Sequence, residues 1–268
     1  MKLFSRKEGS GPALVILHGL YGSSDNWMII AKKLSARFTV FSVDLRNHGH
    51  SPHHHEHTYE AMKEDLFTFY RENKIRDSIL LGHSMGGKVA MAFAADYPEL
   101  IKKLIVVDIA PVNYLETEEE NQYFFHRNIL LAMLEINFDR INTRQQVEEK
   151  LAEKIDDLKT CQFLIKNIVV DKHTHRLKWR LNIEALYENL DEIVRGIDFR
   201  FFDSRIPIHS YQVIFIRGLE SPYVKDRYLP VIQKIYPESV IMDIPGAGHW
   251  LHAEQTGLFL EAVTKCCH

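Results

Sequence analysis

This sequence has few cysteines, no long apolar run and no large excess of either charge. Its three cysteines, Cys161, Cys266 and Cys267, are too few for a disulfide framework and are typical of a reducing compartment. No apolar run approaches the ~20 residues that a membrane-spanning helix needs. The first residues, MKLFSRKEGSG, contain no apolar signal segment. We therefore expect a cytoplasmic protein with no membrane partner.

The charge balance argues against a nucleic-acid partner. The net charge is −3, and acidic and basic residues are interspersed along the chain. Hydrophobic residues make up 46% and charged residues 26% of the 268 positions, which is typical of a globular protein. A chain of this length can form one large α/β domain or one domain with a sizeable insertion.

The first part of the chain alternates strand and helix patterns. Short β-branched runs ending in Gly or Asp predict strands, and amphipathic runs between them predict helices. One further short strand fits before the first of these. Such alternation is typical of a mostly parallel sheet with helices on both faces. The predicted strands are residues 13–19, 38–44, 78–84 and 103–108, and the predicted helices are 25–37, 58–73 with Thr58 as N-cap, and 85–97.

From about residue 112 the pattern becomes mostly helical, and it returns to strand–helix alternation near residue 206. We therefore predict a helical cap over 112–205, inserted into an α/β core formed by 1–111 and 206–268. Within the cap, Thr143 and Gln146 match a capping box, 177–181 alternates like a strand, and 183–194 is strongly periodic in the helical sense. The second core segment predicts strands at 212–217 and 239–244, a helix at 223–236, and a final helix with His252 in its first turn.

The segment LLGHSMGG carries the clearest chemical signal. Gly82, Ser84 and Gly86 form a Gly-x-Ser-x-Gly pattern, which is weak evidence alone. Here an apolar strand ends directly before it and an Ala-rich helix begins directly after it. That context predicts a nucleophile elbow, a strained turn with Ser84 at its tip and no room for a Cβ at either glycine. The alternative is a surface serine in a glycine-rich loop.

Two backbone N–H groups are needed to hold the oxyanion of acyl transfer. We expect one from Met85, directly after the nucleophile, and the other from Leu20, with Tyr21 next, in the loop after the first long strand. His249 lies in a glycine-rich loop after the last strand and is the predicted general base. His18 is expected to brace its loop by hydrogen bonds. His252 is expected to have a packing or capping role.

Four motifs stand in order along the chain: LHGLYGS, DLRNHGHS, GHSMGG and GAGHW. This arrangement resembles the α/β-hydrolase superfamily over nearly the whole chain. The segments DLRNHGHSP, GHSMGGKVAM, VVDIAPVNY, SPYV and GAGHWLHAE are more closely similar to bacterial YbfF-type esterases, and through them to animal ABHD-type serine hydrolases. The resemblance implies a carboxylesterase with a helical cap that acts on short acyl esters, with acyl-CoA thioesters as a further class.

The triad acid is less obvious. The superfamily pattern Gly-x-x-Asp-Pro falls on GLESP, where Ser221 fills the Asp position. A hydroxyl cannot stabilise an imidazolium as a carboxylate does. Glu220 is one residue early and would point to the opposite side of an extended segment. Asp108 ends the strand after the nucleophile helix, and the resembled family carries its acid in this DIAP motif. We therefore favour Asp108 and keep Glu220 as the alternative.

Several other side chains have a functional and a structural interpretation. Trp250, beside the predicted base, could line an acyl pocket or pack under the cap. Phe124 and Phe125, like Tyr21, could line the substrate pocket or belong to ordinary apolar packing. The run HGHSPHHHEH over 48–57 invites a metal hypothesis, yet it lacks helical spacing and an acidic cage. We interpret it as a solvated loop, with His48 and Gly49 structural.

The combined prediction is an α/β-hydrolase fold that hydrolyses carboxylic esters through an acyl-enzyme. Ser84, His249 and Asp108 would form the triad, and no metal or organic cofactor is required. The expected partner is a small acyl ester or thioester. A C–C bond hydrolase or lyase and a non-catalytic receptor on the same scaffold remain alternatives, because a fold alone does not decide function.

Overall fold

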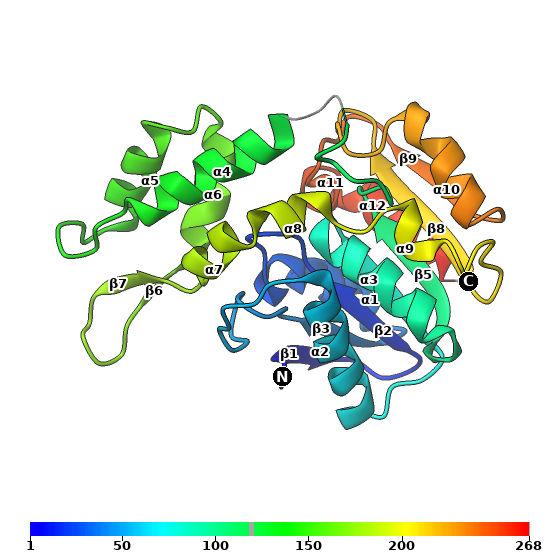
Figure 1. The fold of residues 1–268 in the computed structure, drawn as a ribbon. Coiled ribbons are helices and arrows are strands. Elements are labelled where there is room, and N and C mark those ends of the chain that lie inside the picture. The colour runs from blue at the N-terminus through cyan, green and yellow to red at the C-terminus, as the bar shows by residue number, and fades with distance from the viewer. Residues whose placement is uncertain (118–120, 268) are drawn as a thin grey trace.

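The computed structural model describes residues 1–117 and 121–267. Its centre is a seven-stranded sheet with the order β1-β3-β2-β4-β5-β8-β9 (Figure 1). Only β1 runs antiparallel to its neighbour, so the sheet is mostly parallel, as predicted. The strands are β1 (Ser5–Glu8), β2 (Ala13–Leu17), β3 (Thr39–Val43), β4 (Ser78–His83), β5 (Ile101–Val107), β8 (Gln212–Gly218) and β9 (Val240–Ile244).

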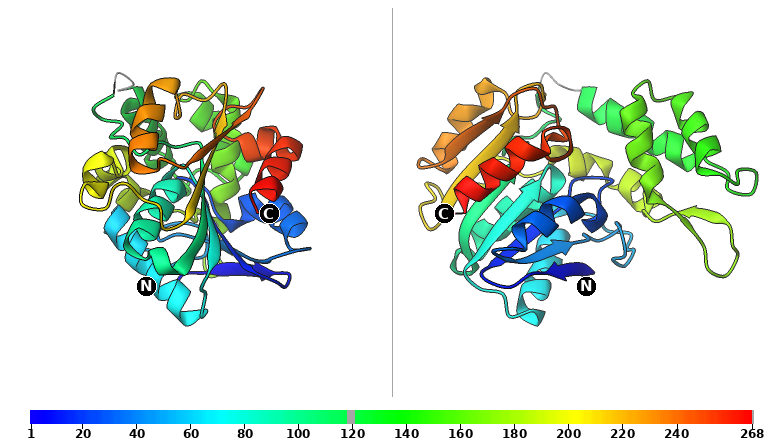
Figure 2. Two further views of the ribbon diagram at one scale, coloured as in Figure 1. Left: turned by 90° about the vertical axis from the view of Figure 1, so that its right-hand side faces the viewer. Right: turned by 180° about the vertical axis from the view of Figure 1, so that it is seen from behind.

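Helices cover both faces of this sheet (Figure 2). Along β2, Leu14 and Ile16 join an apolar cluster with α1 and α12, whereas Val15 and Leu17 join the cluster on the opposite face with α2, α3 and α10. Alternation of this kind is what a strand buried on both faces requires. The core helices are α1 (Met28–Leu34), α2 (Tyr59–Glu72), α3 (Met85–Asp96), α10 (Leu229–Ile235), α11 (Leu251–Glu254) and α12 (Thr256–Cys266).

The chain between β5 and β8 forms a largely helical insertion. Helices α4, α5 and α6 and a two-stranded hairpin make a lobe beside the sheet, and α7, α8 and α9 lead back across the core (Figure 1). The predominance of helix agrees with the sequence pattern. The elements are α4 (Asn121–Leu134), α5 (Arg144–Ala152), α6 (Leu158–Leu164), β6 (Ile168–Val170), β7 (Leu177–Trp179), α7 (Ile183–Glu188), α8 (Leu190–Arg195) and α9 (Phe199–Phe202).

Local capping signals are confirmed by the structure. The Thr58 side chain accepts a hydrogen bond from the N–H of Ala61 at the start of α2, at 3.2 Å. Thr143 and Gln146 form a reciprocal capping box at the start of α5. These interactions span three residues, so a sequence pattern is sufficient to predict them.

Some predicted helices are shorter or interrupted. The periodic segment 183–194 is helical but not continuous: it breaks at Asn189 into α7 and α8, and the Asn189 side chain donates to the carbonyls of Ala185 and His55. The predicted final helix is likewise two helices, α11 and α12, which meet at Gln255. The predicted helices 25–37 and 223–236 each begin as a 3-10 turn, η1 (Ser24–Trp27) and η4 (Asp226–Tyr228).

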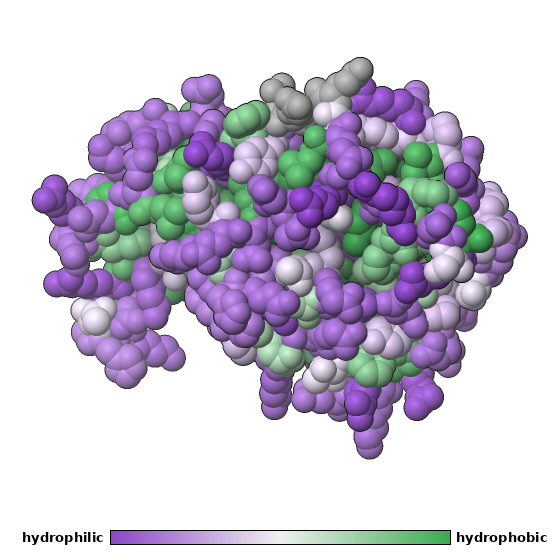
Figure 3. All heavy atoms as spheres, in the orientation of Figure 1, coloured by the Kyte–Doolittle hydropathy of each residue, from purple (hydrophilic) through white to green (hydrophobic). Residues whose placement is uncertain are grey.

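Hydrophilic side chains cover most of the face shown in Figure 3, and apolar side chains emerge between them in patches. Among residues 1–117 and 121–267, no helix has both the length and the apolar content to cross a bilayer.

Candidate active site

Ser84 lies at the tip of the turn that joins β4 to α3. Its backbone has φ 53° and ψ −121°, a conformation that a non-glycine residue rarely adopts. Hydrogen bonds on both sides of the turn stabilise this strained backbone conformation. The Ser84 N–H donates to the carbonyl of Val107 at 2.9 Å, and the Ser84 carbonyl accepts from the N–H of Gly87 at 2.8 Å. The turn therefore presents the Ser84 side chain at the carboxyl edge of the sheet.

The two glycines of the pattern are required by close packing. A Cβ on Gly82 would lie 2.2 Å from the carbonyl oxygen of Gly86, across the turn. A Cβ on Gly86 would lie 2.5 Å from the carbonyl oxygen of His18 on the neighbouring loop. Neither backbone atom can move aside without disturbing the elbow.

Ser84, His249 and Asp108 form a continuous hydrogen-bonded chain, although they are far apart in sequence. The Ser84 Oγ lies 2.9 Å from Nε2 of His249, and Nδ1 of His249 lies 2.7 Å from Oδ2 of Asp108. A carboxylate at Nδ1 holds the proton there, which leaves Nε2 free to accept the proton of the hydroxyl. Asp108 directly follows β5, which pairs with β4, as the sequence predicts.

The Asp108 carboxylate is fully buried, and three donors surround it. Besides His249, Oδ1 accepts the N–H of Gly218 at 3.1 Å, and Oδ2 accepts the hydroxyl of Ser221. Ser221 thus lies beside the acid. Glu220 is exposed in the wall of the adjacent cavity. Among the described residues, no hydrogen bond or ion pair joins the Glu220 carboxylate to His249.

Of the two predicted oxyanion donors, Met85 directly follows Ser84 in the chain, and Leu20 lines the same cavity as Ser84. Met85 is the first residue of α3, where backbone N–H groups have no intrahelical acceptor. Within residues 1–117 and 121–267, no acceptor is assigned to the N–H of Leu20 or Met85. The next N–H along the loop, that of Tyr21, is already bonded to Nε2 of His48 at 3.2 Å.

His18 and His48 hold the loop that contains Leu20. Nε2 of His18 accepts the N–H of Leu45 at 3.0 Å, so Nδ1 carries the proton and donates to the carbonyl of Gly19 at 2.8 Å. Burial lowers the pKa of both His18 and His48, which keeps them neutral at pH 7. Both histidines therefore have the bracing role expected from their positions.

No sequence pattern assigned a role to His83, although it lies inside the elbow motif. Its side chain is buried, and Nε2 lies 2.8 Å from the carbonyl oxygen of His249. A carbonyl oxygen can only accept a hydrogen bond, so Nε2 of His83 carries the proton. Burial lowers the pKa of the His83 ring well below its ordinary value. His83 is the residue directly before Ser84, so this hydrogen bond ties the His249 loop to the nucleophile elbow.

Two aromatic contacts also surround His249. The Tyr223 ring stacks on the His249 ring at a centroid distance of 4.0 Å and an angle of 29°. His252 stacks on Trp27 at 4.3 Å and 8°, in agreement with its expected packing role, and burial lowers its pKa to about 3. Tyr223 lies in the SPYV segment, but no sequence pattern assigned a role to its ring or to Trp27.

A cavity of about 530 Å³ opens onto Ser84 and His249. Its wall combines residues of the core with residues of the insertion, including Phe125 and Phe163. Of the predicted pocket residues, Tyr21, Phe125 and Trp250 line this cavity, and the Trp250 ring also packs on Phe163 at 5.2 Å. Phe124 is 55% exposed and lies outside the cavity wall, so the structure does not bring it to the site.

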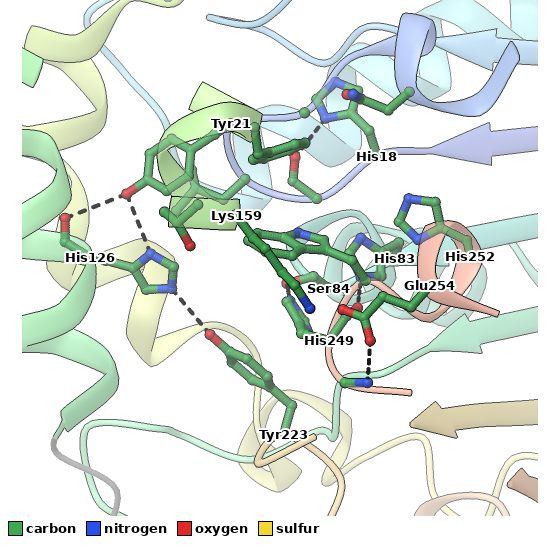
Figure 4. Close-up of a pocket in the computed structure, with 18 of the residues that line it drawn as sticks. His18, Tyr21, His83, Ser84, His126, Lys159, Tyr223, His249, His252 and Glu254 are labelled. Carbon is green, nitrogen blue, oxygen red and sulfur yellow. Dashed lines mark hydrogen bonds between the residues drawn. The ribbon is translucent and has the colours of Figure 1, made fainter. Parts of the chain in front are cut away.

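His126 of α4 connects the insertion to the loops of the core (Figure 4). Its ring nitrogens lie 3.3 Å from the hydroxyl of Tyr21 and 3.2 Å from the hydroxyl of Tyr223. The Tyr223 hydroxyl donates in turn to Oε1 of Gln122 at 2.6 Å. Burial lowers the pKa of His126 to about 3, so the His126 ring is neutral at ordinary pH.

The histidine-rich loop is only partly solvated, which corrects the expectation from sequence. His48 and His57 are buried, and the backbone carbonyls of His54 and His55 accept hydrogen bonds from Asn182 and Asn189 of the insertion. The loop therefore fastens the insertion to the core. Among the described residues, no group of three or more His, Cys, Asp or Glu side chains is placed to hold a metal ion.

Comparisons with known proteins place this chain among relatives of one fold. A family model described as the alpha/beta hydrolase fold matches residues 12–135. The chain is 36% identical over 259 residues to the sn-1-specific diacylglycerol lipase ABHD11 of Xenopus laevis, covering 94% of this chain and 78% of that protein. It is 32% identical over 261 residues to esterase YbfF of Escherichia coli, covering 97% and 95%. The solved structure of a marine microorganism esterase matches with a TM-score of 0.91 and 41% identity over 98% of both chains.

The chain therefore belongs to the α/β-hydrolase family. Within that family, the lipase and the esterases to which it is similar identify it as an enzyme of the serine hydrolase class.

Proposed function

We propose that this enzyme hydrolyses carboxylic esters through an acyl-enzyme formed on Ser84. The observation that carries the proposal is the hydrogen-bonded chain from Ser84 through His249 to buried Asp108, open to a 530 Å³ cavity at the nucleophile. The relatives named as a lipase and as esterases support the ester bond as the reacting group.

In the first step, His249 takes the proton of Ser84 as Oγ attacks the ester carbonyl. The N–H groups of Leu20 and Met85 stabilise the oxyanion, each contributing about 3 kcal/mol to lowering the barrier. Asp108 keeps His249 in the tautomer that can accept this proton. The leaving alcohol then takes the proton from Nε2, and water activated by the same nitrogen releases the acid. A thioester would react by the same steps, with a thiol as the leaving group.

Labelling with a fluorophosphonate tests the nucleophile. The wild-type enzyme should be labelled and should hydrolyse nitrophenyl esters, whereas Ser84→Ala should lose labelling and about 10⁶-fold in kcat. A chain that binds ligand without catalysis would resist labelling in its wild-type form, and that result would reject the proposal.

The acid is tested by a matched pair of isosteric variants. Asp108→Asn should lower kcat by about 10⁴-fold, because Asn favours the wrong tautomer of His249. Glu220→Gln should retain most of the activity, since among the described residues the partner of His249 Nδ1 is Asp108 and not Glu220. A severe loss confined to Glu220→Gln would assign the acid to Glu220 instead.

A further inference from the structure

Lys88 is a buried lysine that the proposed reaction steps do not use. It lies on α3, one turn after Ser84, and its backbone N–H donates to the Ser84 carbonyl at 3.1 Å. The residue is only 1% exposed, and burial lowers the pKa of its side chain to about 7. Burying an ammonium group carries a cost unless polar partners surround it. An apolar side chain would fill this space without that cost, so the partners of Lys88 indicate its role.

The ammonium group of Lys88 joins the two ends of the insertion. Nζ donates to the carbonyl of Val112, where the chain leaves the core after β5, at 2.6 Å. It also donates at 3.2 Å to the carbonyl of Arg195, the last residue of α8, where the chain returns. The next residue, Gly196, has φ 63°, and a Cβ there would lie 2.1 Å from Nζ. The returning backbone therefore approaches the ammonium group more closely than a residue with a side chain would allow.

The ring of Tyr114 lies against the same ammonium group. Nζ of Lys88 is 4.7 Å from the centroid of the Tyr114 ring, a distance typical of a cation–π contact. The Tyr114 hydroxyl accepts the N–H of Ala110 at 3.0 Å and donates to the carbonyl of Tyr223 at 2.5 Å. Ala110 is two residues after Asp108, so these contacts fix the loop close to the triad acid.

The backbone of Asp108 is strained and depends on such support. Its φ is 52°, in the left-handed region that residues with a side chain rarely occupy. On the strand side, the Asp108 N–H donates to the carbonyl of Ile216 at 2.8 Å. On the other side, the chain runs directly into the segment that Lys88 and Tyr114 hold. A shift of that segment would let the backbone relax and would move the carboxylate away from Nδ1 of His249.

We propose that Lys88 is a positioning residue for the triad acid. Its ammonium group holds the loop after Asp108 in the strained conformation that directs the carboxylate to His249. The same group holds the returning end of the insertion, so the place of the insertion and the orientation of the acid depend on one side chain of the nucleophile helix. This inference rests on the proposed function, since it gives Lys88 a part in forming the triad of ester hydrolysis.

The contacts of Lys88 favour action through the loop over direct contact with substrate. Lys88 borders a space of about 30 Å³ beside Ser84. Two of the three N–H groups of its ammonium, however, already bind the carbonyls of Val112 and Arg195, and the ammonium faces the Tyr114 ring. A loss of Lys88 should therefore lower kcat and leave substrate binding nearly unchanged.

The first experiment compares Lys88→Met with the wild type in the hydrolysis of nitrophenyl acetate. Methionine keeps an unbranched apolar stem but has no N–H to donate. We expect kcat to fall about 10- to 100-fold and KM to change by less than about 2-fold, since a shift of about 1 Å in a catalytic group costs about 100-fold in rate. The matched control is Lys103→Met, because Nζ of Lys103 also donates to a backbone carbonyl, that of Cys266, at 2.6 Å. A wild-type kcat in Lys88→Met, or an equal loss in the control, would overturn the inference.

The second experiment is a double-mutant cycle that separates positioning of the acid from a general loss of structure. If Lys88 acts through Asp108, Lys88→Met should lower kcat by less than about 3-fold in the Asp108→Asn background, where the carboxylate is already absent. A purely structural role would lower kcat by the same factor in both backgrounds. An equal loss in the two backgrounds would therefore contradict the inference.

Tyr114→Phe gives a second, milder variant. Phenylalanine keeps the ring that faces Lys88 but removes the hydroxyl that binds Ala110 and Tyr223. We expect kcat to fall about 10-fold, as for the loss of one buried hydrogen bond, with little change in KM. If urea denaturation shows that Lys88→Met does not fold, the same cycle with Tyr114→Phe decides the inference. An unchanged kcat in Tyr114→Phe would overturn it.

Fluorophosphonate labelling of Ser84 separates this inference from the proposed function. A labelled, active wild-type enzyme whose kcat does not depend on Lys88 would contradict only the positioning role. A wild-type enzyme that is neither labelled nor active on any ester would contradict the proposed function, and the positioning role with it.

Discussion

The hydroxyl of Ser221 donates a hydrogen bond to Oδ2 of Asp108, the same carboxylate oxygen that lies at Nδ1 of His249. Ser221 occupies the position at which the superfamily pattern has an aspartate, in the loop after β8. Asp108 comes from the loop after the neighbouring strand β5. The two loops thus converge on one point, and the carboxylate is supplied from one side and a supporting donor from the other.

Ser221→Ala should lower kcat/KM by about 10-fold without abolishing activity. The variant removes one donor from a buried carboxylate, and a hydrogen bond to a charged group contributes about 1.5–3 kcal/mol. The N–H of Gly218 and the ring of His249 would still bind Asp108. Ester hydrolysis by the purified variant measures the effect. Activity equal to that of the wild type would show that the hydroxyl does not help to orient the acid.

The convergence of the two loops also predicts a rescue. Asp108→Asn combined with Ser221→Asp should recover at least about 10-fold over Asp108→Asn alone, since a carboxylate at position 221 would lie next to the same imidazole. Asp108→Asn combined with Ser221→Asn is the control, because it has the same shape without the charge. Equal activity of the two double variants would contradict the prediction.

His83→Phe should reduce kcat more than it changes KM. The ring of His83 holds the carbonyl of His249 at 2.8 Å, and a phenyl ring fills the space but cannot donate. A shift of about 1 Å in a catalytic group can cost about 100-fold in rate. Steady-state kinetics test this, with the exposed His55→Gln as the control variant. An unchanged kcat in His83→Phe would assign the residue a packing role only.

The sequence predicted the elements of this fold because each rests on a local pattern. The β4–Ser84–α3 elbow, the strand before Asp108 and the loop of His249 each have a motif within a few residues, and the parallel sheet brings those strand ends to one edge. The contacts that it did not predict join distant positions. His83 and His249 are 166 residues apart, and Ser221 and Asp108 are 113 apart. No periodicity or spacing in one sequence encodes such pairs.

The insertion was less predictable for a related reason. Its helical character follows from composition, but the break at Asn189 depends on the hydrogen bond from this side chain to the carbonyl of His55 in the core. The partial burial of the histidine-rich loop has the same origin, because Asn182 and Asn189 of the insertion lie against it. Tertiary contacts here override the local pattern.

Gly82→Ala should prevent formation of the native elbow, whereas Gly257→Ala should leave the protein intact. The added Cβ at position 82 would lie 2.2 Å from the carbonyl oxygen of Gly86, and at position 257 nothing lies within 4 Å. Alanine in α12 should even add a few tenths of a kcal/mol, because glycine costs about 0.5–1 kcal/mol within helices. Thermal melting of both variants checks this. A folded, fully active Gly82→Ala would refute the steric argument.

The free energy of unfolding should fall as the pH is lowered from about 6.5, and His252 should account for part of the slope. Burial lowers the pKa of His252 to about 3 in the folded state, while the unfolded chain binds the proton near its ordinary value of 6.5. Between these two values only the unfolded state is protonated, so stability is complete above pH 6.5 and declines toward pH 3 by about 1.4 kcal/mol per pH unit for each such group.

His252→Phe isolates this contribution. Phenylalanine can keep the stacking on Trp27 and removes Nδ1, a buried atom for which the described residues provide no hydrogen-bond partner. Urea denaturation between pH 4 and 7.5 should therefore give the variant a shallower slope, by about one proton, and a stability at pH 7.5 no lower than that of the wild type. His55→Gln, at an exposed position, should retain the wild-type slope. If His252→Phe also retains it, the neutral buried state of His252 is refuted.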